Sequence, residues 1–128
     1  MGTKENKAVV QRFWDELIIG GNLSVADELL APDYVNLIVE GIDATSSAPP
    51  GEGDTIETFK ETIANYHASV SDARMEVLAL AAEGDAVFAR VRFIATGPDG
   101  TTMTSRGLGY YRVVDGKIVM NDILSVPA

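Results

Sequence analysis

The amino-acid sequence predicts an α+β fold in which helices lie on one face of an antiparallel sheet. Helical periodicity is concentrated in the first 69 residues, interrupted by one short extended run. The rest of the chain alternates runs rich in β-branched and aromatic residues with Gly- and Asp-containing turns. Because the chain has 128 residues and 46% of them are hydrophobic, we expect a single domain, 1–128, around one core.

Three segments have the pattern of amphipathic or short helices. Residues 4–19 place apolar side chains at helical spacing, and Gly20-Gly21 ends the pattern. Ser24 is a plausible N-cap for a second, short helix that Pro32 terminates. Residues 55–69 form the third predicted helix, capped by Thr55. These helices supply the layer that is expected to cover the sheet.

The strands are predicted from extended runs separated by turn signals. The runs are residues 34–39, 73–82, 86–96, 101–114 and the segment after Asp115-Gly116. Asp115-Gly116 predicts a two-residue hairpin turn, because both residues tolerate positive φ. Residues 40–54 are rich in Gly, Pro, Ser and acidic groups, which indicates a long loop of the kind that often covers a site.

Composition and charge exclude several classes of function. A net charge of −9 argues against nucleic acid and against anionic membranes as partners. No apolar run is long enough to span a membrane, and the N-terminal residues lack the hydrophobic segment of a signal peptide. Without cysteine the chain has no disulfide, no thiolate nucleophile and no cysteine-based metal site, and no metal is expected. A cytoplasmic location is the resulting expectation.

The last strand contains the principal catalytic candidate, Asp122. Strict alternation from Ile118 places Asp122 on the same face as Met120 and Leu124. A carboxylate in this apolar row is either buried, with a pKa that desolvation raises into a range useful for acid/base catalysis, or solvated on an outer face. The functional interpretation depends on which of these two orientations the strand adopts.

Several segments, in the same order along the chain, resemble the SnoaL-like polyketide cyclase family of the nuclear-transport-factor-2-like superfamily. The resemblance covers roughly residues 5–125. It rests on residues 13–16 (FWDE), 21–23 (GNL), 29–34 (LLAPDY), 59–60 (FK), 82–87 (AEGDAV) and 115–119 (DGKIV). It implies a cone-shaped curved antiparallel sheet wrapped around the helices, with an apolar pocket at its open end. It also implies a homodimer formed through the outer face of the sheet.

The resemblance implies cofactor-independent, acid/base-catalysed intramolecular ring closure of the aldol type, with one aspartate on the last strand. Asp122 is the nearest match. It comes one position earlier than the family pattern, so Ile123 occupies the catalytic position unless a β-bulge shifts the strand. The two orientations of Asp122 therefore stay open at this point.

Further residues are expected to contact a small, apolar, oxygenated substrate. Tyr34 and Asn36 resemble the Tyr-x-Asn pair of limonene-type epoxide hydrolases, where Arg90 and Asp122 would complete the set, although Arg92 stands where a second carboxylate is needed. The only histidine, His67, is a possible carbonyl donor or simply a favourable helix-end residue. The remaining predicted contacts are Trp14, which also suits the core, and Asn121.

Ring closure of a polyketide-type substrate is the function that the sequence favours. Asp122 would act as acid/base, and the other candidates would orient and polarise a carbonyl group. No cofactor is expected. Two alternatives remain: an epoxide hydrolase on the same fold, and a non-catalytic protein that binds a hydrophobic ligand.

Overall fold

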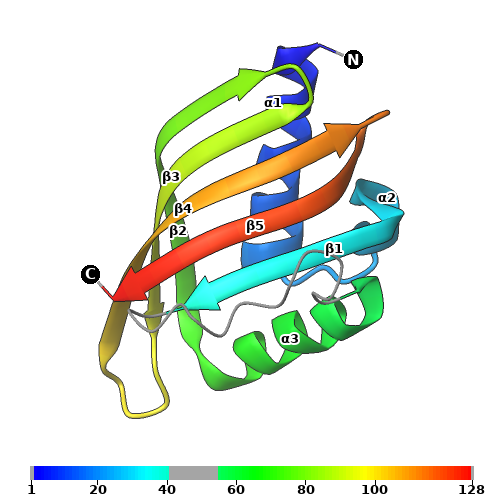
Figure 1. Ribbon diagram of the computed structural model, residues 1–128. Helices are drawn as coiled ribbons and strands as arrows, with labels where there is room; N and C mark the ends of the chain where they lie inside the picture. The colour runs from blue at the N-terminus through cyan, green and yellow to red at the C-terminus, as the bar shows by residue number, and fades with distance from the viewer. Residues whose placement is uncertain (1, 41–54, 128) are drawn as a thin grey trace.

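The computed structural model describes residues 2–40 and 55–127, and the side chains of residues 2–35 and 55–127. Helices come first in the chain and most strands come last (Figure 1). The helical elements are α1 (Thr3–Arg12), the π-helix η1 (Phe13–Ile19), α2 (Val25–Leu29) and α3 (Ile56–Ser69). The strands are β1 (Leu30–Glu40), β2 (Ser71–Glu83), β3 (Ala86–Thr96), β4 (Thr102–Val114) and β5 (Lys117–Pro127). The predicted α+β class is confirmed. Of the loop predicted at 40–54, Glu40 belongs to β1, and residues 41–54 lie outside the described residues.

The sheet has the strand order β1-β5-β4-β3-β2. The strands β2 to β5 form an antiparallel meander, whereas β1 pairs with β5 in parallel. The hairpin predicted at Asp115-Gly116 is present, and both residues have positive φ, 51° and 75°. The first strand begins at Leu30, earlier than predicted, because an edge strand tolerates Pro32, which has no N–H to donate.

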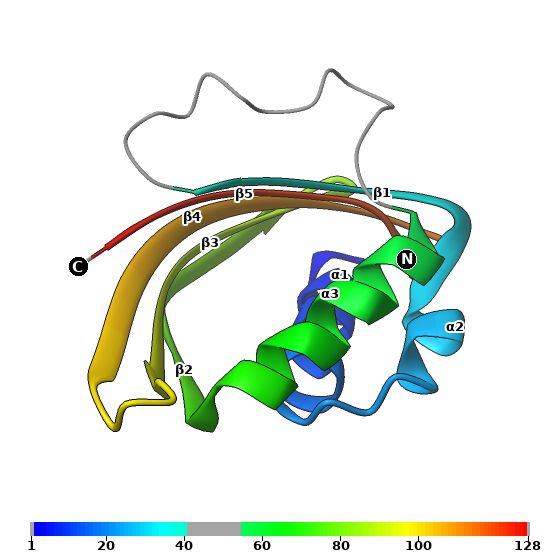
Figure 2. The ribbon, with the colours of Figure 1, turned by 90° about the horizontal axis from the view of Figure 1, so that it is seen from below.

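The sheet curves strongly, and the helices lie on its concave side (Figure 2). One continuous helical segment, α1 followed by η1, runs along this side. The predicted helix 4–19 is thus correct in extent, but from Phe13 it widens into π geometry. The wider turns place Phe13, Trp14 and Leu17 in the core. The ring of Phe13 stacks on Phe59 of α3 at 5.9 Å between centroids, so the two helical elements share one apolar interface.

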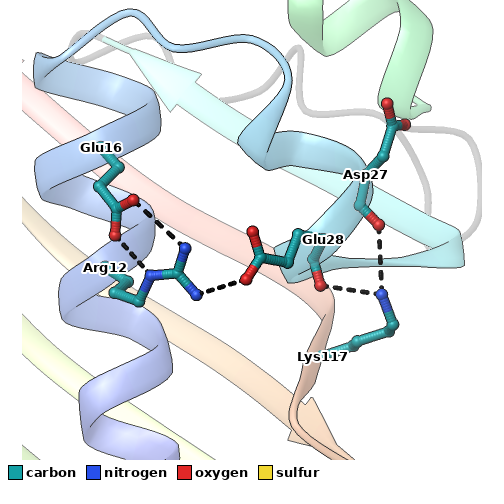
Figure 3. A network of polar contacts seen from close by, with 5 residues as sticks. All are labelled: Arg12, Glu16, Asp27, Glu28 and Lys117. Atoms are coloured by element: carbon teal, nitrogen blue, oxygen red, sulfur yellow. Dashed lines mark hydrogen bonds and ion pairs between the residues drawn. The ribbon is translucent and has the colours of Figure 1, made fainter.

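A polar network connects the helical layer to the sheet at the end where α2 meets β1 (Figure 3). Arg12 is hydrogen-bonded to Glu16 on its own helical segment and reaches Glu28 of α2, with 2.9 Å between Nη1 and Oε1. Lys117 donates from β5 to the backbone carbonyl oxygens of Asp27 and Glu28. These carbonyls belong to the end of a short helix, where acceptors lack intrahelical partners. The network therefore fixes α2 against β5.

Within residues 2–40 and 55–127, no helix is long and apolar enough to cross a membrane.

Candidate functional site

A cavity of about 600 Å³ lies between η1, α3 and the concave face of β3, β4 and β5. This volume is in the range of small-molecule sites. Seventeen residues line it: Phe13, Trp14, Ile18, Phe59, Thr62, Ile63, Tyr66, Phe93, Ala95, Met103, Thr104, Ser105, Tyr111, Asn121, Ile123, Ser125 and Pro127.

The lining has no formal charge in the part of the chain that the structure describes. Aromatic and aliphatic side chains form most of the wall, and none of the seventeen residues is Asp, Glu, His, Lys or Arg. Such a wall favours an apolar molecule, because burial of apolar surface drives binding whereas burial of an unpaired charge is costly. The cavity therefore suits a ligand that is mainly hydrocarbon with a few neutral oxygen atoms.

Neutral hydrogen-bonding groups are placed at a few points of this wall. Asn121 is only 3% exposed and Tyr111 only 1%. Tyr111 accepts a hydrogen bond from the indole Nε1 of Trp14 at 3.0 Å, and burial raises its pKa to about 12. Desolvation also raises the pKa of Tyr66, on α3. Both phenols therefore stay protonated at neutral pH and can donate hydrogen bonds.

A β-bulge in β5 decides which side chains of the last strand enter the cavity. Val113 of β4 pairs with Ile118, and the preceding residue, Arg112, pairs with Met120, so Val119 is an extra residue in β5. Ile118 faces the core, but after the bulge the inward positions are Asn121 and Ile123. The strict alternation predicted from Ile118 is therefore interrupted.

The inward orientation considered for Asp122 is contradicted by this register. Asp122 pairs with Tyr110 of β4, its side chain is exposed, and it is absent from the cavity lining. Strict alternation from Ile118 would have turned this carboxylate inward, and the extra residue at the bulge turns it outward. Ile123 instead lines the cavity, and it is 7% exposed. Asp122 thus has no access to a ligand in this cavity.

Arg90 also lies on the outer face, which corrects its expected place in the site. It is exposed and pairs with Ala79 of β2 and Leu108 of β4. Leu108, at 60% exposure, is on the same convex surface. The quartet expected for epoxide hydrolysis is therefore not assembled, because Arg90 and Asp122 lie on the face opposite the cavity.

Two other predicted contacts, the buried Tyr34 and the half-buried His67, are not part of the cavity lining. Tyr34 is buried, and its ring lies 5.6 Å from that of Phe59. The Nε2 atom of His67 donates to the carbonyl oxygen of Ile18 at 2.8 Å, which ties α3 to η1. This contact gives His67 a structural role between two helical elements, and its role as a carbonyl donor stays a prediction. The side chain of Asn36 lies outside the described side chains, although its backbone pairs with Asn121.

The structure brings Trp14 and Asn121, two of the predicted contacts, to the cavity wall. Sequence reasoning did not single out Tyr66 of α3 or Ser125 near the end of β5 as cavity residues. A helical position three residues after Ile63 does indicate that Tyr66 shares its face. Ser125 becomes recognisable only when the bulge is known, because it follows Asn121 and Ile123 at alternate positions.

Comparison with known proteins places this architecture in a family. The SnoaL-like domain matches residues 10–121, and the chain belongs to that family. No curated protein matches the chain.

Solved structures of similar fold include three proteins of low sequence identity. IdmH from Streptomyces antibioticus, a proposed polyketide cyclase, is 24% identical; the match covers 94% of this chain and 91% of that chain, with a TM-score of 0.75. A proposed polyketide cyclase from Acidithiobacillus ferrooxidans is 22% identical, over 94% and 87%, with a TM-score of 0.76. An LEH-like epoxide hydrolase from M. tuberculosis is 16% identical, over 98% and 84%, with a TM-score of 0.72. These matches establish the nuclear-transport-factor-2-like fold.

Proposed function

We propose that this SnoaL-like protein is a cofactor-independent enzyme that closes a ring in an apolar, oxygenated, polyketide-type substrate. The observation that carries the proposal is the cavity of about 600 Å³, apolar and uncharged over its described lining, with a few buried neutral hydrogen-bonding groups. The likeness in fold to two proposed polyketide cyclases supports the same class of substrate.

Ring closure in such a cavity depends on positioning. A flexible substrate folded against the aromatic wall brings its two reacting carbons together, which removes much of the entropic part of the barrier. A β-polyketone enolises by itself, so the enol carbon can attack a second carbonyl carbon. One carbon–carbon bond forms, the carbonyl π bond breaks, and the enol proton ends on the new hydroxyl oxygen. The product is an isomer of the substrate.

Asn121 is the residue assigned to polarise the attacked carbonyl. Its amide is buried in the cavity wall on β5, where a hydrogen bond to a developing oxyanion is stronger than in water. Asp122 has no part in this step, because its carboxylate lies on the other face of the same strand. Proton abstraction by Asp122 is therefore not proposed, and neither is epoxide opening by Arg90 and Asp122.

The test uses a linear 1-(2-naphthyl)-1,3,5-triketone and chromatography with mass detection. We expect a cyclic product with the mass of the substrate, or that mass less one water, above the uncatalysed rate. Asn121→Leu should slow its formation by about tenfold, the equivalent of one hydrogen bond. Asp122→Asn should leave the rate unchanged. A large loss in Asp122→Asn with Asn121→Leu unaffected would contradict the proposal.

The second candidate function is ligand binding without turnover. The absence of an ionisable acid or base other than tyrosine among the described lining residues favours it. It predicts stoichiometric capture of the triketone and no cyclic product, whereas the enzyme predicts many product molecules per chain. A single reaction with substrate in large excess distinguishes the two functions.

We also propose a homodimer formed through the convex face of the sheet. Phe88, Leu108 and Leu124 are 49%, 60% and 48% exposed, and they occupy neighbouring positions on β3, β4 and β5. Arg90 and Asp122 flank them on opposite sides and form no salt bridge within the described part of the chain. A two-fold axis across β4 would place Arg90 against the partner subunit's Asp122. The cytoplasmic location stays a prediction from composition.

A further inference from the structure

A buried pair, Trp14 and Tyr111, forms part of the cavity wall where η1 meets β4. Both side chains line the cavity, and each is 1% exposed. Their rings meet edge to face, with 5.6 Å between centroids, and Phe13 contacts the Tyr111 ring from a second side at 5.9 Å. The phenol of Tyr111 is therefore held in one place by packing on both flanks.

The direction of the hydrogen bond between the two residues determines what the phenol can do. The indole N–H is a donor only, so the Tyr111 oxygen must accept from Trp14 Nε1, at 3.0 Å. The phenol's own proton is therefore not used in the bond to Trp14 and is available to another acceptor. Among the side chains that the structure describes, those of residues 2–35 and 55–127, no hydrogen bond from Tyr111 to an acceptor is found. A buried donor without an acceptor is costly, and a ligand oxygen in the cavity would remove that cost.

Gly109 creates the space in which this phenol lies. A Cβ atom at Gly109 would come within 2.9 Å of Tyr111 Cε2 and 3.2 Å of its hydroxyl oxygen. The Tyr111 ring therefore leans along β4 over Gly109, away from the hairpin at Asp115-Gly116 and toward the cavity residue Ser105. The hydroxyl oxygen therefore lies over Gly109, on a residue that lines the cavity.

We propose that Tyr111 is the hydrogen-bond donor that selects ligands with a carbonyl or hydroxyl oxygen at this point of the cavity, and that Trp14 is the positioning residue that directs its proton. The inference rests on the proposed function, because it assumes that the cavity holds a small molecule. It adds a requirement on the ligand: one neutral oxygen must reach the Trp14–Tyr111 pair while the hydrocarbon part lies against the aromatic wall. The raised pKa of Tyr111 agrees with this role, since the phenol remains a donor throughout the physiological range.

The experiment compares two probes of nearly the same shape, 2-acetylnaphthalene and 2-isopropenylnaphthalene, in which a C=CH₂ group replaces the C=O group. Dissociation constants are measured by isothermal titration calorimetry, which does not depend on the fluorescence of Trp14. We expect the wild-type protein to bind the ketone about tenfold more tightly than the alkene, the preference that one hydrogen bond provides. Tyr111→Phe should bind both probes with about the same affinity.

Tyr110→Phe is the matched control, because Tyr110 is the adjacent residue on β4 and contacts Phe88 on the outer face. It should retain the wild-type preference for the ketone. Trp14→Phe keeps an aromatic ring but removes the indole N–H, and it should reduce the preference without abolishing binding of the alkene.

The infrared stretch of the bound ketone gives a second measurement that needs no variant. A hydrogen bond from Tyr111 lowers the carbonyl frequency relative to the ketone in hexane. A ketone preference that survives Tyr111→Phe, or an unshifted carbonyl band in the wild-type protein, would overturn the inference and leave the proposed function standing. Failure of both probes to bind would remove the apolar-ligand function and the inference with it.

Discussion

The two faces of strands β3 to β5 differ completely in chemical character. The concave face, covered by η1 and α3, presents aromatic and aliphatic side chains with a few neutral polar groups and no charge in the described lining. The convex face presents Arg90 and Asp122 around exposed apolar side chains. Neighbouring residues on one strand, such as Asp122 and Ile123, therefore belong to different environments and different functions.

This difference shows that the face of the sheet on which a residue lies determines whether it can take part in chemistry in the cavity. One extra residue, Val119, shifts the inward set of β5 from Met120 and Asp122 to Asn121 and Ile123. The carboxylate of Asp122, which strict alternation would place in an apolar row, is therefore exposed to solvent. The cavity that remains has an apolar wall with a few neutral hydrogen-bonding groups, which suits positioning of a ligand rather than carboxylate catalysis.

The largest expected effect comes from placing a carboxylate on the inner face. Ile123→Asp should lower the free energy of unfolding by about 3 kcal/mol at pH 7, because an unpaired charge is buried there. Leu124→Asp, one residue away on the outer face, should change it by less than about 0.5 kcal/mol. Urea unfolding at a protein concentration where both variants are monomeric measures the difference. Equal effects would mean that the two faces are wrongly assigned.

The buried Tyr111, on the concave face, predicts that the free energy of unfolding depends on pH. Its pKa is about 12 in the folded protein, against an ordinary value of 10.0 for a solvated tyrosine. The unfolded chain therefore loses this proton first, and the stability that Tyr111 contributes is complete below pH 10 and lost between pH 10 and about 12. The loss is at most about 3 kcal/mol. Tyr111→Phe should be less sensitive than the wild type to pH in this interval, and Tyr110→Phe should behave like the wild type.

The outer face is tested by charge exchange in the proposed dimer. Arg90→Glu would place a carboxylate against the partner subunit's Asp122 and should weaken dimerisation by at least about tenfold. The double variant Arg90→Glu with Asp122→Lys restores opposite charges and should recover much of the affinity. Sedimentation velocity over a concentration series measures both. A double variant no better than the single one would argue against this pairing.

The smallest expected effect is that of Asp122→Asn on stability. The side chain is exposed and forms no salt bridge within the described residues, so the free energy of unfolding should change by less than about 0.5 kcal/mol. Thermal unfolding at low protein concentration checks this value. A destabilisation of several kcal/mol would show that the carboxylate has a buried partner and does not lie on the outer face.

Much of this fold follows from local sequence signals. Asp115-Gly116 specifies its turn through backbone conformation alone, and the helical spacing of Phe13, Trp14 and Leu17 identifies the core face of the first helix. These features depend on a few adjacent residues, so the sequence reveals them. Trp14 and Asn121, two of the candidate contacts, lie at the cavity wall, and their contact with a ligand stays a prediction.

The bulge at Val119 could not be predicted in the same way. No residue in Ile118-Val119-Met120 requires positive φ or breaks a strand, and the extra residue exists only because β5 pairs with β4 in a particular register. The position of Asp122 depends on that pairing, so alternation within one strand could not place it. Arg90 lies on β3, which pairs with β4 without a bulge, and its exposed position follows the alternation of that strand. The early start of β1, at Leu30, likewise reflects its pairing with β5 rather than its own sequence.

The central claim is that a small apolar ligand occupies the concave cavity and leaves the convex face untouched. Methyl NMR of Ile- and Leu-labelled protein during titration with 2-acetylnaphthalene tests it most directly. We expect saturable shifts for the methyl groups of Ile63 and Ile123, which line the cavity, and none for Leu108 and Leu124. Shifts confined to Leu108 and Leu124, with Ile63 and Ile123 unchanged, would contradict the claim.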